Sequence, residues 1–329
     1  MRLLSAAVAA FTSLSLTGHA YGYLIDPDSC KGDDYTLVKS MVEQAFTMVN
    51  IAMVEVNAQP MNKDATWLMK QLFNTEGSAA QAMVNQVFQA KPPNNKGQRT
   101  GILVFEKETT TANLDTLDQN EVVIFCDTTR LERRVNDLVH YYDKKVKQAV
   151  GKSNGCSTGA FMYTQQFVNK WDIIQVCPWF LEYAHSKKYA TKADLSSLRA
   201  KMAVHGLDKL ITDKFYTPID LMSLWDKCML HEMMHTKPGG SKQDVGGVSG
   251  YGWKNCKGLG QSGTGVNNAD SWALFGSALY QFSLGSPIDE NGDFSKTAIQ
   301  TRSNSKRRLG SGPGRARDII KLDTVKNFV

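Results

Sequence analysis

Two histidines four residues apart, His231 and His235, flank Glu232 in the segment KCMLHEMMHTKPGGSKQD. Residues at positions i and i+4 of a helix share one face, so both imidazoles could bind the same metal ion. Zinc accepts imidazole ligands at about 2.0–2.1 Å, and a catalytic zinc keeps one position for water. Glu232 would lie beside that water, where it can accept a proton and later pass it to a leaving amine. The spacing therefore predicts a zinc-dependent peptidase, with His231 and His235 as ligands and Glu232 as general base.

The alternative interpretation is a core helix whose histidines are only hydrogen-bonded. Residues 219–237 are apolar on nearly every side, which is typical of a buried helix. Burying two imidazoles and a carboxylate without partners costs several kcal/mol, and a bound ion removes that cost. We therefore prefer the metal site. The other histidines are interpreted as ordinary polar or partly buried residues: His19, His140, His185 and His205.

A third ligand is expected downstream of His235, close enough for the chain to fold back. Glutamate and histidine are absent from residues 236–289, so an aspartate must serve. Asp244 follows the glycine-rich turn by a few residues and is the preferred ligand. Asp270 is the alternative ligand. If it is not a ligand, it could lie behind the ligands or line the substrate pocket. It could also simply start a helix, where an acidic residue suits the helix dipole.

The helix that carries the two histidines has clear boundaries, about 218–236. Thr217 can cap it, Pro218 suits its first position and Asp220 occupies the capping-box position. Pro238-Gly239-Gly240 is a stop signal. Apolar spacing or composition predicts further helices at 35–56, 64–74, 78–90, 128–150, 195–204 and 269–282, and strands at 101–107, 121–127, 160–168 and 172–177. This order indicates an α+β fold.

The first twenty residues have the pattern of a secretory signal peptide. Arg2 precedes a short apolar stretch that ends in Gly18-His19-Ala20. We expect cleavage after Ala20 and a secreted protein, without another stretch of the roughly 18 apolar residues that a membrane span needs. The six remaining cysteines are even in number, which favours disulfides in an exported chain.

Residues 285–329 form a basic segment rich in Gly, Ser and Arg, with nine Lys and Arg against five Asp and Glu. Because it contains few apolar groups, we expect a disordered tail, with nucleic-acid binding as the less favoured alternative. Residues 21–284 are expected to form one metallopeptidase domain. We expect a monomer that acts on polypeptides and binds neither nucleic acid nor, after signal removal, a membrane.

Several short segments resemble one known family. They are His231 to His235, Asp244, Tyr251-Gly252 and Asn268-Ala269-Asp270, with weaker matches at Ser29 to Asp33 and Ala160 to Thr164. Together they resemble the deuterolysin and peptidyl-lysine metalloendopeptidases of fungi, the aspzincins. In that family the signature helix is followed by Gly-Thr-x-Asp-x-x-Tyr-Gly and later by Asn-Ala-Asp.

The resemblance implies a secreted zinc endopeptidase with a zincin-like domain, mostly helical with a small sheet. It implies that His231, His235 and an aspartate bind one zinc ion, with Glu232 as general base. It also suggests the disulfides Cys30–Cys126 and Cys156–Cys177. A third, Cys228–Cys256, would then join the zinc-binding helix to the segment after Tyr251.

The aspartate spacing departs from the family pattern. Tyr251 lies seven positions after Asp244, whereas in the family the tyrosine lies three positions after the aspartate. An insertion explains this difference. An alignment fixed on Tyr251 would instead place Val248 at the position of the aspartate and favour Asp270 as ligand.

The expected catalytic and specificity residues depart as well. The family has a tyrosine on a strand that helps to stabilise the transition state, and here Ile173 and Ile174 occupy that strand. Tyr251 is the candidate substitute, or else supports the turn. Lysine-selective members have a glutamate soon after Asn-Ala-Asp, which is absent here, so Asp270 alone would favour a basic residue after the scissile bond.

Two functions from different classes follow. The first is a zinc endopeptidase that cuts extracellular or host protein. The second is a secreted zincin-like protein that holds zinc or a host partner without turnover, which the missing tyrosine and the altered spacing would explain.

Overall fold

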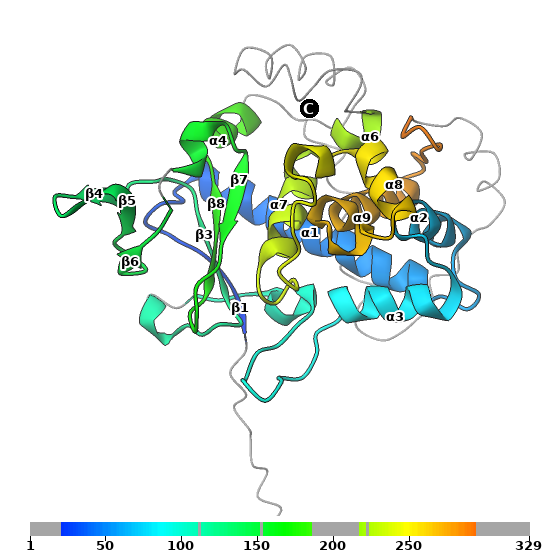
Figure 1. Cartoon of the computed structure of the whole chain (residues 1–329), viewed down its shortest axis with the longest axis horizontal. Helices are drawn as coiled ribbons and strands as arrows, with labels where there is room; N and C mark the ends of the chain where they lie inside the picture. The colour runs from blue at the N-terminus through cyan, green and yellow to red at the C-terminus, as the bar shows by residue number, and fades with distance from the viewer. Residues whose placement is uncertain (1–20, 111–112, 152–153, 186–216, 222–223, 294–329) are drawn as a thin grey trace, which may run out of the picture.

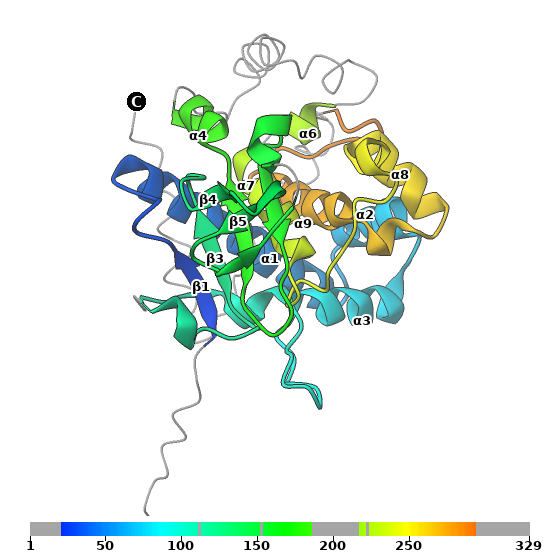
Figure 2. The same cartoon turned by 60° about the vertical axis from the view of Figure 1, so that its left-hand side comes forward.

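The computed structural model describes residues 21–110, 113–151, 154–185, 217–221 and 224–293. These residues form a mixed helix and strand fold, in which a five-stranded sheet lies between a layer of helices and a small three-stranded sheet (Figure 1). Figure 2 shows the same layers after a turn, with α1, α7 and α9 still together on one side of the main sheet. The predicted mixture of helices and a small sheet is confirmed.

The main sheet has the strand order β2-β1-β3-β8-β7. Its strands are β1 (Gly22–Ile25), β2 (Lys107–Glu108), β3 (Val122–Phe125), β7 (Met162–Gln165) and β8 (Asp172–Val176). Four of them are parallel, and β7 pairs antiparallel with β8 at one edge. The edge strand β7 lies against α7 (Leu224–His235).

Alternating side chains of the central strands separate the core into two parts, as the two-residue period of a strand requires. Ile124 and Ile174 face the helices and belong to the large core. Val123 and Ile173 face the other way, into a smaller cluster that includes Val146 near the three-stranded sheet. Both faces of the sheet are therefore covered, which explains why β3 is apolar throughout.

The helices are α1 (Asp33–Asn57), α2 (Lys63–Phe73), α3 (Gly77–Phe88), α4 (Pro178–His185), α6 (Pro218–Leu221), α7 (Leu224–His235), α8 (Trp253–Gln261) and α9 (Ala269–Ser283). The predicted helices at 35–56, 64–74, 78–90 and 269–282 are confirmed within a few residues. Contacts of α7 with α1, α9 and β7 place the predicted metal-binding helix between the helical layer and the sheet. The helix predicted at 195–204 lies outside the described residues.

Two secondary-structure predictions are wrong. Residues 128–150, predicted as a helix, form the antiparallel strands β4 (Leu131–Arg134), β5 (Asp137–Asp143) and β6 (Gln148–Ala149). Their high charge suggested a helix, but Tyr and Val are frequent here and favour strands. Residues 101–107, predicted as a strand, form mainly a short 3-10 helix, Ile102–Phe105. An apolar run this short does not separate the two alternatives.

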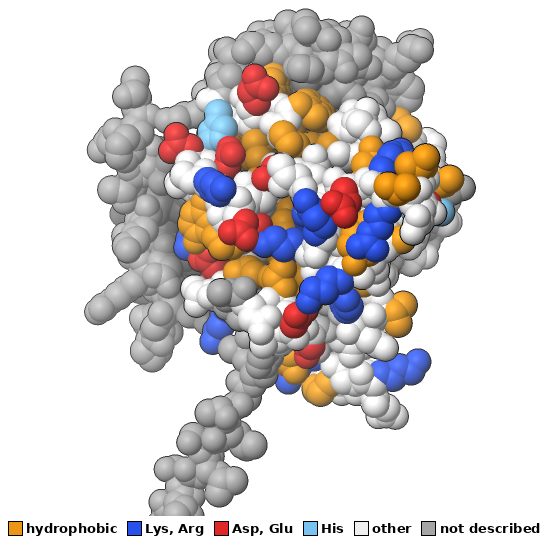
Figure 3. All heavy atoms as spheres, turned by 90° about the vertical axis from the view of Figure 1, so that its left-hand side faces the viewer, with side chains coloured by type: hydrophobic (Ala, Val, Ile, Leu, Met, Phe, Trp, Pro, Cys, Tyr) orange, Lys and Arg blue, Asp and Glu red, His pale blue; other side chains and the backbone are white. Residues whose placement is uncertain are grey.

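The buried side chain of Arg130 joins the three-stranded sheet to the main sheet. Arg130 Nε donates to Asp143 Oδ2 at 2.7 Å, and its Nη1 donates to the Asp127 carbonyl and to Gln175 of β8. On the face that carries this small sheet, acidic and basic side chains lie among apolar ones (Figure 3).

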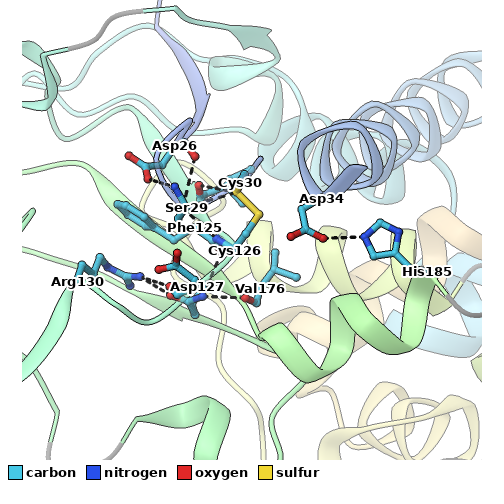
Figure 4. Close-up of a disulfide and its surroundings, with 12 residues drawn as sticks. Asp26, Ser29, Cys30, Asp34, Phe125, Cys126, Asp127, Arg130, Val176 and His185 are labelled. Carbon is cyan, nitrogen blue, oxygen red and sulfur yellow. Dashed lines mark hydrogen bonds and ion pairs between the residues drawn. A yellow bond between two sulfur atoms is a disulfide. The ribbon is translucent and has the colours of Figure 1, made fainter. Parts of the chain in front are cut away.

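Two of the three expected disulfides are present, Cys30–Cys126 and Cys156–Cys177. Figure 4 shows the first of them, which ties the chain just before α1 to the end of β3. Near it, His185 Nε2 contacts Asp34 Oδ1 at 2.7 Å and so links α4 to α1. Both disulfides brace the sheet and the helices around it.

The expected disulfide between Cys228 and Cys256 is wrong, because both cysteines are free. Cys256 Sγ faces the Gly250 carbonyl at 3.3 Å and Asp270 Oδ2 at 3.7 Å. On α7, the side chains that reach Asp270 are those of Lys227 and His231. The Cys228 sulfur is not among these contacts of Cys256, and the two thiols are not bonded.

The folded domain continues beyond the expected boundary at residue 284. Ile288 is buried, Trp253 Nε1 donates to the Glu290 carbonyl at 3.0 Å, and Ile219 N donates to the Gly292 carbonyl at 3.2 Å. Residues 285–293 thus pack on α6 and α8, which corrects that boundary. The predicted signal peptide, residues 1–20, and residues 294–329 lie outside the described residues. In the described part of the chain, no helix has the length and apolar character needed to cross a membrane.

Candidate metal centre

The sequence predicts one helix at about 218–236, whereas the described residues form two helices, α6 (Pro218–Leu221) and α7 (Leu224–His235), and residues 222–223 lie outside them. The predicted capping contacts are present at the start of α6. Thr217 N donates to the Asp220 side chain at 2.5 Å, which is the capping-box contact, and the Thr217 hydroxyl donates to the same oxygen at 2.9 Å. The other oxygen of Asp220 accepts from Trp253 N at 2.7 Å. Burial raises the pKa of Asp220 to about 6, although Lys227 and the hydrogen bonds oppose this shift.

The end of α7 is anchored to the sheet. Lys237 N donates to Asp172 Oδ2 at 2.6 Å, and Lys237 Nζ donates to Asp172 and to the Phe167 carbonyl. Gly239 lies where a Cβ would meet the Met233 carbonyl oxygen at 2.0 Å, so only glycine permits this close turn. The predicted stop at Pro238-Gly239-Gly240 therefore has a steric basis.

Three ligand-type atoms converge beside this anchored helix end. His231 Nε2 lies 3.0 Å from His235 Nε2, and Asp244 Oδ1 lies 3.2 Å and 3.3 Å from these two nitrogens. For a tetrahedral ion with bonds of about 2.0–2.1 Å, two ligand atoms lie about 3.3–3.4 Å apart. The triangle has nearly the size that such an ion requires. His231, His235 and Asp244 could thus hold a metal ion.

The far side of each imidazole faces an acceptor. His235 Nδ1 lies 2.6 Å from the Lys242 carbonyl oxygen, and His231 Nδ1 lies 3.4 Å from Asp270 Oδ1. These partners assign the ring proton to Nδ1 and leave the lone pair of each Nε2 directed at the triangle. Asp244 Oδ1 is buried and has no hydrogen-bond partner among the described residues. Three atoms with free lone pairs therefore face one another, and such atoms can bind a cation.

The loop that carries Asp244 is fixed to the start of α9. Gln243 N donates to the Asn267 carbonyl and Ala269 N donates to the Gln243 carbonyl, both at 2.9 Å. Asn268 Oδ1 accepts from Val245 N at 3.1 Å, and its Nδ2 donates to the Gly250 carbonyl at 2.8 Å. The segment that resembles the family's Asn-Ala-Asp therefore has a clear structural role, because Asn268 shapes the loop that presents Asp244.

Asp270 lies behind His231 and not at the triangle. It is 3% exposed, its Oδ1 lies 3.6 Å from Lys227 Nζ, and its Oδ2 accepts from Gly252 N at 2.7 Å. Lys227, His231 and the backbone donor together lower the pKa of Asp270 although burial raises it. Of the alternatives for Asp270, the position behind a ligand agrees with this geometry. A position in an open substrate pocket does not.

The carboxylates around the histidines dominate the electrostatics of the site. Burial lowers the pKa of His231, but Asp244, Asp270 and Glu232 raise it by more, to about 10. The pKa of His235 is also raised, because Asp244 outweighs burial. Although burial raises the pKa of Asp244, both imidazoles hold it well below its usual range. The site therefore strongly favours positive charge between these groups.

Glu232 lies beside the triangle and is 7% exposed. Thr164 Oγ1 of β7 lies 2.8 Å from Glu232 Oε2 and 2.9 Å from the Glu232 carbonyl oxygen. The carboxylate is thus held between the helix and the edge strand. The Glu232 charge also helps to raise the pKa of both His231 and His235.

Tyr251 also belongs to the site. Its ring lies 5.4 Å from that of His231, centroid to centroid. Burial and then the Asp244 carboxylate raise the pKa of its hydroxyl above the usual range, so it stays protonated at neutral pH. Ile173 and Ile174 are fully buried in the sheet and present no polar group to the site.

The longer spacing between Asp244 and Tyr251 is accommodated by a local turn. Residues Gly247–Gly250 form a short 3-10 helix, and Val248 is 60% exposed on it. Val248 therefore does not replace Asp244, and the insertion explains the spacing. The sequence pattern gives Lys227 no role in this site, and it includes Thr164 and Asn268 only within segments that resemble the family. Only the polar character of Thr164 and Lys227 within apolar segments could have indicated them.

Comparison of the chain with models of protein families, with curated proteins and with solved structures finds no match.

Proposed function

We propose that this protein is a zinc-dependent endopeptidase of the aspzincin type, in which His231, His235 and Asp244 bind one zinc ion. The observation that carries this proposal is the triangle of two imidazole nitrogens and one carboxylate oxygen, with edges of 3.0 to 3.3 Å, beside the Glu232 carboxylate. Two nitrogens and one oxygen suit zinc better than calcium or magnesium, which prefer oxygen ligands. Three protein ligands leave the fourth position of a tetrahedral ion open.

The chemistry follows from what surrounds the ion. When bound, zinc supplies positive charge that polarises a peptide carbonyl and makes a water molecule more acidic. Glu232 would accept a proton from the attacking water and deliver it to the leaving amine. Tyr251 keeps its hydroxyl proton at neutral pH and lies against the ring of His231, so it can donate a hydrogen bond to a developing oxyanion.

The edge strand β7 gives a substrate peptide a place to bind. Its one partner among the described strands is β8, and α7 packs against it beside Glu232. A peptide in extended conformation could add to such an edge through main-chain hydrogen bonds. This mode of binding suits an endopeptidase, because it needs no chain terminus.

The cellular setting is part of the proposal. Two disulfides fit a compartment that is oxidising, and the first twenty residues have the pattern of a signal peptide. We propose a secreted monomer that acts on polypeptides and uses neither nucleic acid nor a membrane. Because Asp270 is neutralised by Lys227, we propose no strict preference for basic residues at the cleavage site.

A zincin-like protein that holds zinc or a host partner without turnover is the second candidate. The observation that favours it is the burial of Ile173 and Ile174 in β8, because this strand then brings no tyrosine hydroxyl to the site. Glu232 separates the two candidates. A carrier needs the three ligands only, whereas an enzyme also needs this carboxylate.

The test is digestion of a mixed-protein substrate, analysed by mass spectrometry, with the wild type, the wild type plus chelator, and Glu232→Gln. The proposal expects new peptides with the wild type alone and a loss of roughly 100-fold or more in the variant. Zinc content of the variant should stay at one ion per chain. A wild type that holds zinc but releases no peptides would contradict the enzyme and favour the carrier.

A further inference from the structure

The hydrogen bond between Thr164 and Glu232 joins the edge strand to the residue proposed as general base. Thr164 belongs to the side of β7 that faces α7, whereas Tyr163 lies on the opposite side, near Arg130. Two residues further along, Gln166 donates to the His235 carbonyl and to Ser241 Oγ. Alternate residues from β7 therefore contact α7, as the period of a strand requires. Of these contacts, the one from Thr164 reaches a carboxylate.

The Thr164 hydroxyl has two acceptors but only one proton. Glu232 Oε2 lies 2.8 Å away and the Glu232 carbonyl oxygen 2.9 Å away. A hydrogen bond to an ionised carboxylate is about twice as strong as one between neutral groups. The proton therefore turns to Oε2 while Glu232 is charged.

We propose that Thr164 is a positioning residue for Glu232, a role that rests on the peptidase function proposed above. Its hydroxyl engages Oε2 and leaves Oε1 without this contact. In the proposed reaction one proton leaves the water for Glu232, and the hydroxyl of Thr164 loses none, so Thr164 positions the base without being a base itself. A methyl group in place of this hydroxyl would leave the carboxylate free to rotate.

The physical consequence is a defined orientation of the carboxylate before reaction. Misplacement of a reacting group by about 1 Å can cost roughly 100-fold in rate. Thr164 also contacts α7 through its packing, so a structural role has to be separated from a positioning role. Valine has the shape of threonine without the hydroxyl, and serine keeps the hydroxyl without the methyl group. These two substitutions make that separation.

The experiment compares Thr164→Val and Thr164→Ser with a matched control, Thr109→Val. Thr109 is also partly buried and follows β2 at the opposite edge of the same sheet, where its hydroxyl contacts the Tyr23 carbonyl at 3.3 Å. For each purified full chain, kcat, KM, zinc content and Tm are measured. Tm is also measured for Thr164→Val in a Glu232→Ala background.

We expect Thr164→Val to lower kcat roughly 10–100-fold, with KM and zinc content unchanged. Thr164→Ser should keep kcat within about threefold of the wild type, and Thr109→Val should have no effect on kcat. The Tm decrease caused by Thr164→Val should shrink when Glu232 is alanine, because the contact is then already lost. This last readout needs no activity.

Three results would overturn the inference. Thr164→Val could retain the full kcat, or valine and serine could impair kcat equally, or the Tm effect could be the same with and without the Glu232 side chain. Failure of the proposed function looks different, since the zinc-loaded wild type would then be as inactive as the variants.

Discussion

His231 Nε2 and His235 Nε2 lie 3.0 Å apart, and each nitrogen belongs to a ring whose other nitrogen faces an acceptor. Two lone pairs therefore face each other in a nearly buried place, with Asp244 Oδ1 beside them. Such an arrangement is unfavourable unless a cation or a proton lies between the groups. This relationship, more than the sequence spacing alone, supports a metal site.

Removal of ligands should weaken zinc binding in a fixed order. Asp244→Ala deletes a direct ligand and should weaken zinc binding by more than roughly 100-fold. Asp270→Asn removes the carboxylate behind His231 and should cost roughly 10–100-fold. Asp115→Asn is the control, because Asp115 is exposed and paired with Lys147. Competition with a zinc-selective chelator measures all three, and equal affinities for Asp244→Ala and the wild type would contradict the assignment.

Zinc affinity should rise with pH. The neighbouring carboxylates outweigh burial and raise the pKa of His231 to about 10, so the metal-free site holds a proton at neutral pH. The ion must displace that proton, so affinity should increase roughly tenfold per pH unit for each proton displaced, between about pH 6 and about pH 8. Calorimetry in buffers of different ionisation heat counts the released protons. A release of none would show that the pKa is not raised.

The same raised pKa predicts how the metal-free protein responds to pH. The folded pKa of His231 lies above its ordinary value, so protonation stabilises the fold below about pH 6.5. That contribution is lost as pH rises toward about 10. With chelator present, Tm should therefore fall over this range more steeply for the wild type than for His231→Ala. If Tm falls equally with pH in the wild type and in His231→Ala, protonation of His231 does not stabilise the metal-free fold.

Thiol chemistry tests the corrected cysteine pattern. Cys228 and Cys256 are free and burial raises their thiol pKa values, that of Cys228 to about 12. Both thiols should react slowly with a thiol-specific reagent in the folded protein. In denaturant without reductant, two thiols per chain should react, because the other four cysteines are bonded. If no thiol reacts in the denatured chain, Cys228 and Cys256 are bonded to each other and our assignment is wrong.

The two disulfides should differ in their contribution to stability. Cys30 and Cys126 are 96 residues apart in the sequence, and Cys156 and Cys177 are 21 apart. The loop-entropy model gives about 4.7 kcal/mol for a loop of the first size and about 3 kcal/mol for the second. Paired Cys→Ala variants, unfolded in denaturant, should show this order. The reverse order would mean that packing around the bridges outweighs loop entropy.

The sequence predicted which three side chains converge, because helical spacing and a turn determine this locally. His231 and His235 share a face by helix geometry, and the glycine turn lets Asp244 return to them. The role of Asp270 was left open, since it depends on Lys227, which lies one turn before His231. Nothing in the sequence indicates which of two aspartates a buried lysine will contact.

The sheet and its edges were harder to predict. Residues 128–150 carry many charges, and their pairing as strands depends on the buried contact between Arg130 and Asp143. Thr164 is an ordinary strand residue until β7 is placed beside α7. The strand pairing of residues 128–150 and the contact of Thr164 with α7 both depend on segments that are distant in the sequence. Local strand propensity therefore does not predict them.

The most direct test of the central claim is a crystal structure of the purified protein with anomalous data collected on both sides of the zinc absorption edge. We predict one zinc peak per chain, with His231 Nε2, His235 Nε2 and Asp244 Oδ1 at about 2.0–2.2 Å. A protein without zinc, or a zinc ion bound elsewhere while the two imidazoles point apart, would contradict the account.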